Sequence, residues 1–97
     1  MTKPRRRDDI TKLEDLPNIG PAMAADLRLL GIREPAQLRG QDGFELYRRL
    51  CGVTGMRQDP CVIDVFLAAV DFMNGAPSRP WWFYTKIRKA AQKDGRA

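Results

Sequence analysis

Backbone amide groups beside Gly20 are the first feature of this sequence that could do chemistry. Gly20 has no side chain and lets the chain approach another surface closely, and Pro21 then opens a predicted helix. The first N–H groups of a helix have no partner within it, and they carry the positive end of the helix dipole. Such groups bind phosphate without reading base identity, so the turn predicts contact with the DNA backbone. The predicted contact residues are Asn18, Ile19, Gly20, Ala22 and Met23, with added charge from Lys12 and Arg28.

A second candidate surface combines aromatic and basic side chains between residues 79 and 89. Aromatic rings can stack on unpaired bases while positive charges hold the phosphates, a combination typical of proteins that bind single-stranded DNA. Because adjacent residues of a helix point about 100° apart, Trp81 and Trp82 cannot both face one core. We expect Trp81 and Tyr84 to cover the core and Trp82 to be exposed, where it contacts either DNA or a protein partner. The predicted contact residues here are Trp82, Lys86, Arg88 and Lys89.

Catalysis is not expected, because the chain contains no histidine. Histidine is the usual general base near neutral pH and the commonest metal ligand, so we predict no catalytic residue, no metal site and no enzyme. Cys61 follows Asp59-Pro60, and in the first turn of a helix the dipole would lower the pKa of its thiol. The alternative, which we favour, is a small buried apolar side chain, because no Cys-x-x-Cys arrangement is present.

The charged residues are unevenly distributed along the chain, with the excess of positive charge at its two ends. The 97 residues suffice for one domain. The net charge is +5. Residues 79–97 carry six basic residues and one acidic residue, whereas residues 10–78 carry seven basic and nine acidic residues. Basic ends either hold phosphates or keep a protein in solution. We therefore expect a flexible basic tail at 1–9, a helical domain at 10–90 and a frayed basic tail at 91–97. No apolar run approaches the roughly 20 residues that span a bilayer, which predicts a cytoplasmic protein without membrane contact.

The spacing of apolar residues predicts an all-α fold, a compact bundle of about five short helices, because no alternation typical of strands extends beyond four residues. The run Thr11-Lys12-Leu13-Glu14 has the form of a capping box and predicts a short first helix that ends before Pro17. The second helix is predicted from Pro21 to Gly31. Its inward residues, with those of the first helix and the turn, form an apolar seam of Leu13, Leu16, Ile19, Ala24, Leu27 and Leu30.

Three further helices are predicted downstream, besides a single turn at 34–38. One begins with Asp42 as its cap and ends at Gly52 and Gly55, and residues 52–55 are interpreted as a plain loop rather than a degenerate second hairpin. The longest begins at Asp59-Pro60 and ends at Asn74-Gly75. Its Asp64 and Asp71 are expected to face away from the apolar stripe. The last helix follows residue 80 and continues through residue 89.

The segment Leu13 to Leu27 resembles the helix-hairpin-helix motif. The pattern of two apolar residues, then Gly-apolar-Gly, then Ala and Leu falls on Leu13, Leu16, Asn18-Ile19-Gly20, Ala24 and Leu27. The resemblance implies DNA binding without sequence specificity, through turn amides on backbone phosphates. Asn18 stands where the motif has its first glycine, a position asparagine tolerates because it enters the left-handed region readily. Ala22 stands where many DNA-binding members have Lys or Arg, so one charged phosphate contact is missing.

A longer resemblance covers most of residues 13–88 and is carried by 16–21, by Arg57 to Cys61 and by Pro80-Trp81-Trp82. Over these residues the chain is similar to the small bacterial pathogenicity locus family, some of whose members are named mitomycin resistance proteins. The hairpin half also resembles the C-terminal domain of TfoX-type competence regulators. These resemblances imply a bacterial, cytoplasmic helix-hairpin-helix protein; an accessory role in DNA repair, competence or regulation is our own expectation. They imply no cofactor and allow a sodium or potassium ion on the hairpin carbonyls. The alternative is a protein-interaction adaptor in which the hairpin is purely structural.

Overall fold

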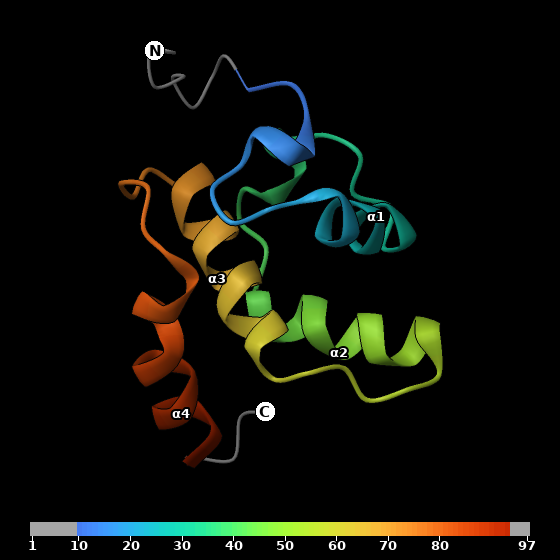
Figure 1. The fold of residues 1–97 in the computed structure, drawn as a ribbon, viewed down its shortest axis with the longest axis vertical. Coiled ribbons are helices and arrows are strands. Elements are labelled where there is room, and N and C mark those ends of the chain that lie inside the picture. The colour runs from blue at the N-terminus through green and yellow to red at the C-terminus, as the bar shows by residue number, and fades with distance from the viewer. Residues whose placement is uncertain (1–9, 94–97) are drawn as a thin grey trace.

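The computed structural model describes residues 10–93, which form four α-helices and three short 3-10 helices with no strand (Figure 1). The all-α prediction is confirmed, although this part of the chain holds four α-helices where about five helices were expected. The tail predicted at 1–9 and the last four residues of the tail predicted at 91–97 lie outside the described residues, whereas residues 91–93 are not frayed but form the end of the last helix. In chain order the elements are η2 (Leu13–Asp15), α1 (Pro21–Leu29), η3 (Pro35–Leu38), α2 (Gly43–Thr54), α3 (Cys61–Met73), η4 (Trp81–Tyr84) and α4 (Thr85–Lys93).

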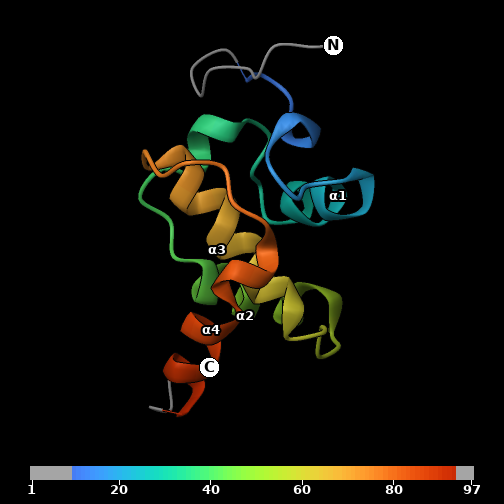
Figure 2. The same ribbon diagram turned by 60° about the vertical axis from the view of Figure 1, so that its left-hand side comes forward.

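Helix α3 runs through the middle of the molecule and packs against α2, η3, η4 and α4 (Figures 1 and 2). Its sequence is apolar on nearly every side, which is the pattern of a helix surrounded by others. Ile63, Phe66 and Ala69 are completely buried. The radius of gyration, 13.0 Å, is that expected for a compact domain of about 100 residues.

The apolar seam predicted around the first turn is confirmed. Its six residues are all buried and belong to one continuous core with α2 and α3. Helix α1 begins at Pro21 and ends before Gly31, whose φ of 83° is the left-handed conformation expected at such a stop. Buried residues both before and after the turn that precedes α1 therefore hold this turn against the core.

Three local predictions are wrong. No capping box forms at Thr11, because the first helix is a single 3-10 turn whose cap position is Lys12 and whose Glu14 turns instead toward Arg28. Residues 52–54 are not a loop but the last turn of α2, which ends at Gly55 with φ 70°. Gly52 is therefore inside the helix. Asp64 does not face away from the core; it is completely buried.

Gly43 marks the closest approach of α2 to α3, and its replacement tests that packing. A Cβ at this position would lie 2.9 Å from Leu67 Cδ2 and 3.0 Å from the Leu67 backbone nitrogen. Because a backbone atom cannot move aside cheaply, we expect Gly43→Ala to lower the free energy of unfolding by about 1–3 kcal/mol. Gly52→Ala is the matched control, since a Cβ there meets nothing within 4 Å. It should raise stability by about 0.5–1 kcal/mol in urea unfolding, and a loss as large as that of Gly43→Ala would refute the packing argument.

Within residues 10–93, no helix has the length and apolar character needed to cross a membrane.

Candidate functional site

The turn between η2 and α1 presents its backbone to solvent at Gly20. Asn18 adopts φ 67°, which confirms that asparagine takes the left-handed place of the missing glycine. Gly20 is the cap residue of α1, is exposed, and brings no side-chain oxygen, so no side chain caps the first turn of this helix. A Cβ on Gly20 would meet nothing within 4 Å. The amides of Gly20 and the exposed Ala22 are thus reachable by a ligand from outside.

Two predicted contact residues of this turn face inward. Ile19 is a correction: its side chain is buried in the core, and its N–H donates to the Leu16 carbonyl at 3.2 Å, so neither is available to DNA. Met23 is partly buried against the core, so only its backbone remains a candidate. The Ile19 assignment failed because the apolar seam uses this residue of the turn, whereas the Met23 backbone amide stays a predicted contact.

Charge near the turn is less than predicted. Arg28 Nη2 lies 3.0 Å from Glu14 Oε1 and 3.2 Å from Oε2, so its guanidinium already has a carboxylate partner. A backbone hydrogen bond and then the Arg28 guanidinium hold the pKa of Glu14 below its ordinary value. Lys12 is exposed and beside the turn. Of the two cationic side chains expected here, Arg28 forms an ion pair and Lys12 forms none with the side chains of residues 10–93.

A hydrogen bond ties this turn to the aromatic segment, 61 residues further along the chain. Asn18 Nδ2 donates to the Arg79 carbonyl at 2.7 Å. The Arg79 guanidinium in turn lies over the Phe83 ring, 4.6 Å from its centroid. Phe83 also meets Tyr84 edge to face, with 5.2 Å between centroids. No sequence pattern pointed to this bridge, which joins the two candidate surfaces.

The aromatic segment is more exposed than predicted. Trp82 is 64% exposed, as expected. Tyr84, the last residue of the 3-10 helix η4, is buried, also as expected. Trp81, which was expected to cover the core, is 38% exposed: less than Trp82, but not buried as Tyr84 is. Trp82, Phe83, Lys86 and Ile87 line an open groove of 390 Å³ along η4 and the start of α4.

Arg88 is the clearest correction among the predicted DNA contacts. It is only 8% exposed, and its Nε donates to Asp64 Oδ1 at 2.7 Å. Thr85 Oγ1 donates to the other Asp64 oxygen at 2.9 Å, and Arg88 Nη1 donates to Gln92. Arg88 therefore anchors α4 to α3. Lys86 and Lys89, on the same helix, are exposed as predicted.

Comparison with known proteins places this chain among relatives of similar size. Residues 6–90 match the pathogenicity locus family. The chain belongs to that family. It is 46% identical over 81 residues to the mitomycin resistance protein McrB of Streptomyces lavendulae, a match that covers 84% of this chain and 77% of the relative. No solved structure matches the chain.

This member of the pathogenicity locus family carries an exposed thiol at Cys61, which was expected to be buried. The Asp59 carboxylate accepts the N–H of Cys61, the first residue of α3, at 2.9 Å, while Pro60 holds the cap position. A side-chain hydrogen bond with Asp59, followed by burial and the Asp59 charge, raises the pKa of Cys61 above its ordinary value. The Asp59 carboxylate thus acts against the lowering of the Cys61 pKa that was expected from the helix dipole.

We expect iodoacetamide to alkylate Cys61 at pH 7 more slowly than the same thiol in urea, because a raised pKa leaves less thiolate. Asp59→Asn keeps an accepting oxygen and removes the charge, so alkylation should become several-fold faster. The measurement uses a Cys51→Ser background, since Cys51 is the other free cysteine. Equal rates for the folded parent and Asp59→Asn would contradict the assignment.

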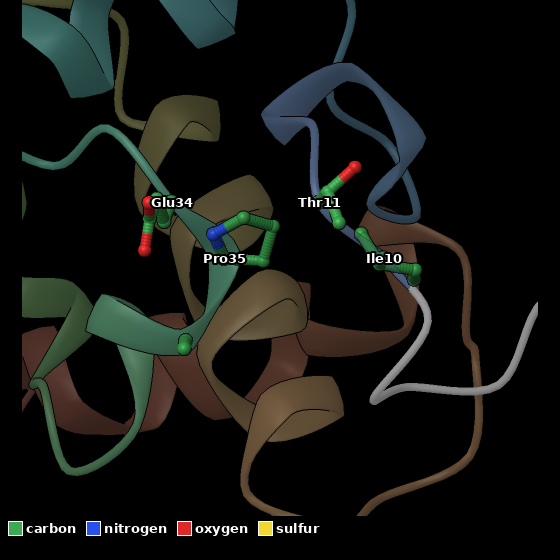
Figure 3. Close-up of a pocket in the computed structure, with 5 residues that line it drawn as sticks. Ile10, Thr11, Glu34 and Pro35 are labelled. Carbon is green, nitrogen blue, oxygen red and sulfur yellow. The ribbon is translucent and has the colours of Figure 1, made fainter.

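A second pocket in this family member, of 160 Å³, lies between the start of the described chain and η3 (Figure 3). Ile10 and Pro35 supply apolar walls, whereas the Thr11 hydroxyl and the Glu34 carboxylate point away from each other (Figure 3). No group of three or more potential metal ligands occurs within residues 10–93. Neither this pocket nor the groove brings together acid, base and nucleophile.

Proposed function

We propose that this protein binds DNA without sequence specificity, through the backbone amides of a helix-hairpin-helix turn at residues 18–23. The observation that carries the proposal is the start of α1, where Gly20 leaves the helix uncapped by any side chain and exposed. A phosphate oxygen would accept from the Gly20, Ala22 and Met23 amides and lie at the positive end of the helix dipole. Backbone donors read no base identity.

Exposed lysines add the charge that such binding needs. Of the five cations predicted to contact phosphates, Lys12 beside the turn and Lys86 and Lys89 on α4 are exposed and remain candidates, whereas Arg28 and Arg88 are held in ion pairs. A sodium or potassium ion on the turn carbonyls remains part of the proposal. The name of the Streptomyces relative adds a process, mitomycin resistance, and we infer an accessory role in repair, competence or regulation.

Fluorescence anisotropy with unrelated labelled duplexes tests this function directly. Each duplex should bind with similar affinity, and the logarithm of the association constant should fall linearly with the logarithm of salt concentration. Unchanged anisotropy at micromolar protein and low salt would refute the proposal, and so would a strong preference for one sequence.

A protein-interaction adaptor is the second candidate, because the turn also has a structural use. The Asn18 side chain donates a hydrogen bond to the Arg79 carbonyl, and the groove beside Trp82 exposes apolar surface. A stoichiometric partner that remains bound after nuclease treatment, and is lost when Trp82 is replaced, would favour this candidate over the first.

A further inference from the structure

Trp82 offers a free aromatic face next to a groove. Phe83 is already held, by the Arg79 guanidinium over its ring and by the edge contact with Tyr84. Trp82 is 64% exposed, and among residues 10–93 no other ring packs against it. Ile87, nearly half exposed, completes an apolar wall, and Lys86 stands at the same groove. A flat, apolar ring system with an attached negative charge would satisfy all of these groups.

The segment that lines the groove carries charge of one sign. Residues 79–93 contain no acidic residue. Lys86, Lys89 and Lys93 are exposed and follow one another at intervals of three and four, so they share one face of α4. Arg88, whose charge is matched by buried Asp64, lies on the opposite side of the helix. The outer face of α4 is therefore a row of lysines that begins at the groove and that forms no ion pair with any other side chain of residues 10–93.

We propose that this groove takes an unpaired base of single-stranded DNA. The base would stack on Trp82 beside Ile87, and the phosphates that follow would lie along the lysine row of α4. Charge complementarity selects this occupant over an apolar helix of another protein, because an apolar helix leaves three lysines unused. Figures 1 and 2 both show α4 extending beyond the rest of the described chain, so a strand can reach its outer face.

The hydrogen bond between Asn18 and Arg79 keeps the two surfaces close enough for one DNA molecule to contact both. Gly20 is two residues from Asn18, and Trp82 is three residues from Arg79, across a hydrogen bond of 2.7 Å. Since a chain spans at most about 3.6 Å per residue, the Gly20 and Trp82 Cα atoms lie within about 30 Å of each other. The two surfaces are therefore separated by no more than the length of about nine base pairs. We therefore infer that the preferred ligand is DNA in which a duplex continues into an unpaired strand. The contact with the duplex rests on the proposed function.

Single-tryptophan variants provide the test, because Trp81 and Trp82 are the only tryptophans of the chain. Trp81→Phe leaves Trp82 as the fluorophore, and Trp82→Phe leaves Trp81 as the matched control. Oligothymidine of about 15 nucleotides should quench Trp82 and not Trp81. Trp82→Ala should weaken oligothymidine binding about tenfold, and a tailed duplex should bind more tightly than its blunt counterpart.

Each outcome of these measurements decides one part of the inference. Absent quenching of Trp82, or equal quenching by polyglutamate, which has the charge but no bases, overturns the base site. Equal affinity for tailed and blunt duplexes overturns the proposed DNA class. Quenching by oligothymidine without any blunt-duplex binding supports the groove while the turn fails as a phosphate site. Loss of blunt-duplex binding in Gly20→Asp with quenching retained supports both sites.

Discussion

Replacement of Asp64 by alanine is expected to lower the free energy of unfolding by about 3–5 kcal/mol. Asp64 is fully buried and accepts from Arg88 Nε at 2.7 Å and from Thr85 Oγ1 at 2.9 Å. Its removal leaves the Arg88 guanidinium largely buried without a counter-charge, and that desolvation is no longer offset. Because small domains are stable by only about 5–15 kcal/mol, much of the total is lost. Urea unfolding followed by circular dichroism measures the effect.

Two variants separate the lost pair from other causes. The double change Asp64→Leu with Arg88→Met removes both charges and should recover most of the stability, because no buried charge is left alone. Glu14→Ala breaks the exposed ion pair with Arg28 and should change stability far less, because solvent screens that pair. An Asp64→Ala protein as stable as Glu14→Ala would show that α4 does not depend on its buried anchor.

The second large effect is expected from Gly20→Asp, which should weaken duplex binding by more than tenfold while the fold is kept. Gly20 has φ −94° and ψ −174°, which any residue can adopt, and a Cβ there meets nothing within 4 Å. Aspartate is a favoured cap residue, so its carboxylate should accept an amide of the first turn and add a few tenths of a kcal/mol to stability. The same carboxylate then occupies and repels the place proposed for phosphate.

Gly20→Ser is the control that separates charge from capping. Serine also caps the helix but carries no charge, so it should reduce duplex binding less than aspartate does while stabilising the fold to a similar extent. Anisotropy at low salt and urea unfolding on the same preparations give both quantities. Wild-type duplex affinity in Gly20→Asp would contradict a phosphate site at this turn.

Local features of the sequence predicted most of the fold. Pro21 and Gly31 bracket α1, Asp42 accepts the Phe44 N–H as the cap of α2, and Gly55 ends that helix in the left-handed conformation. These predictions succeeded because each depends on residues only a few positions apart. Thr11 failed as a cap because η2 begins one residue later than predicted, with Lys12 at the cap position, and because Glu14 pairs with the distant Arg28.

The candidate site was less predictable, because its decisive contacts join distant residues. Arg88 was grouped with the solvent-facing lysines by composition, yet it pairs with Asp64, 24 residues earlier. Two signals could have indicated this. Asp64 lies in a helix apolar on nearly every side, where a charge needs a partner, and Arg88 follows buried Tyr84 by four residues, on the same helical face. No comparable signal pointed to the Asn18–Arg79 bond.

That bond limits how the turn can be transplanted. A synthetic peptide covering residues 13–32 would contain every apolar residue of the seam but not the Arg79 carbonyl that accepts from Asn18. Left-handed backbone at a residue other than glycine carries a conformational cost, and the peptide would lack the distant acceptor that helps to offset it. A graft of this segment into a foreign scaffold would therefore need an acceptor at the same place, or glycine in place of Asn18.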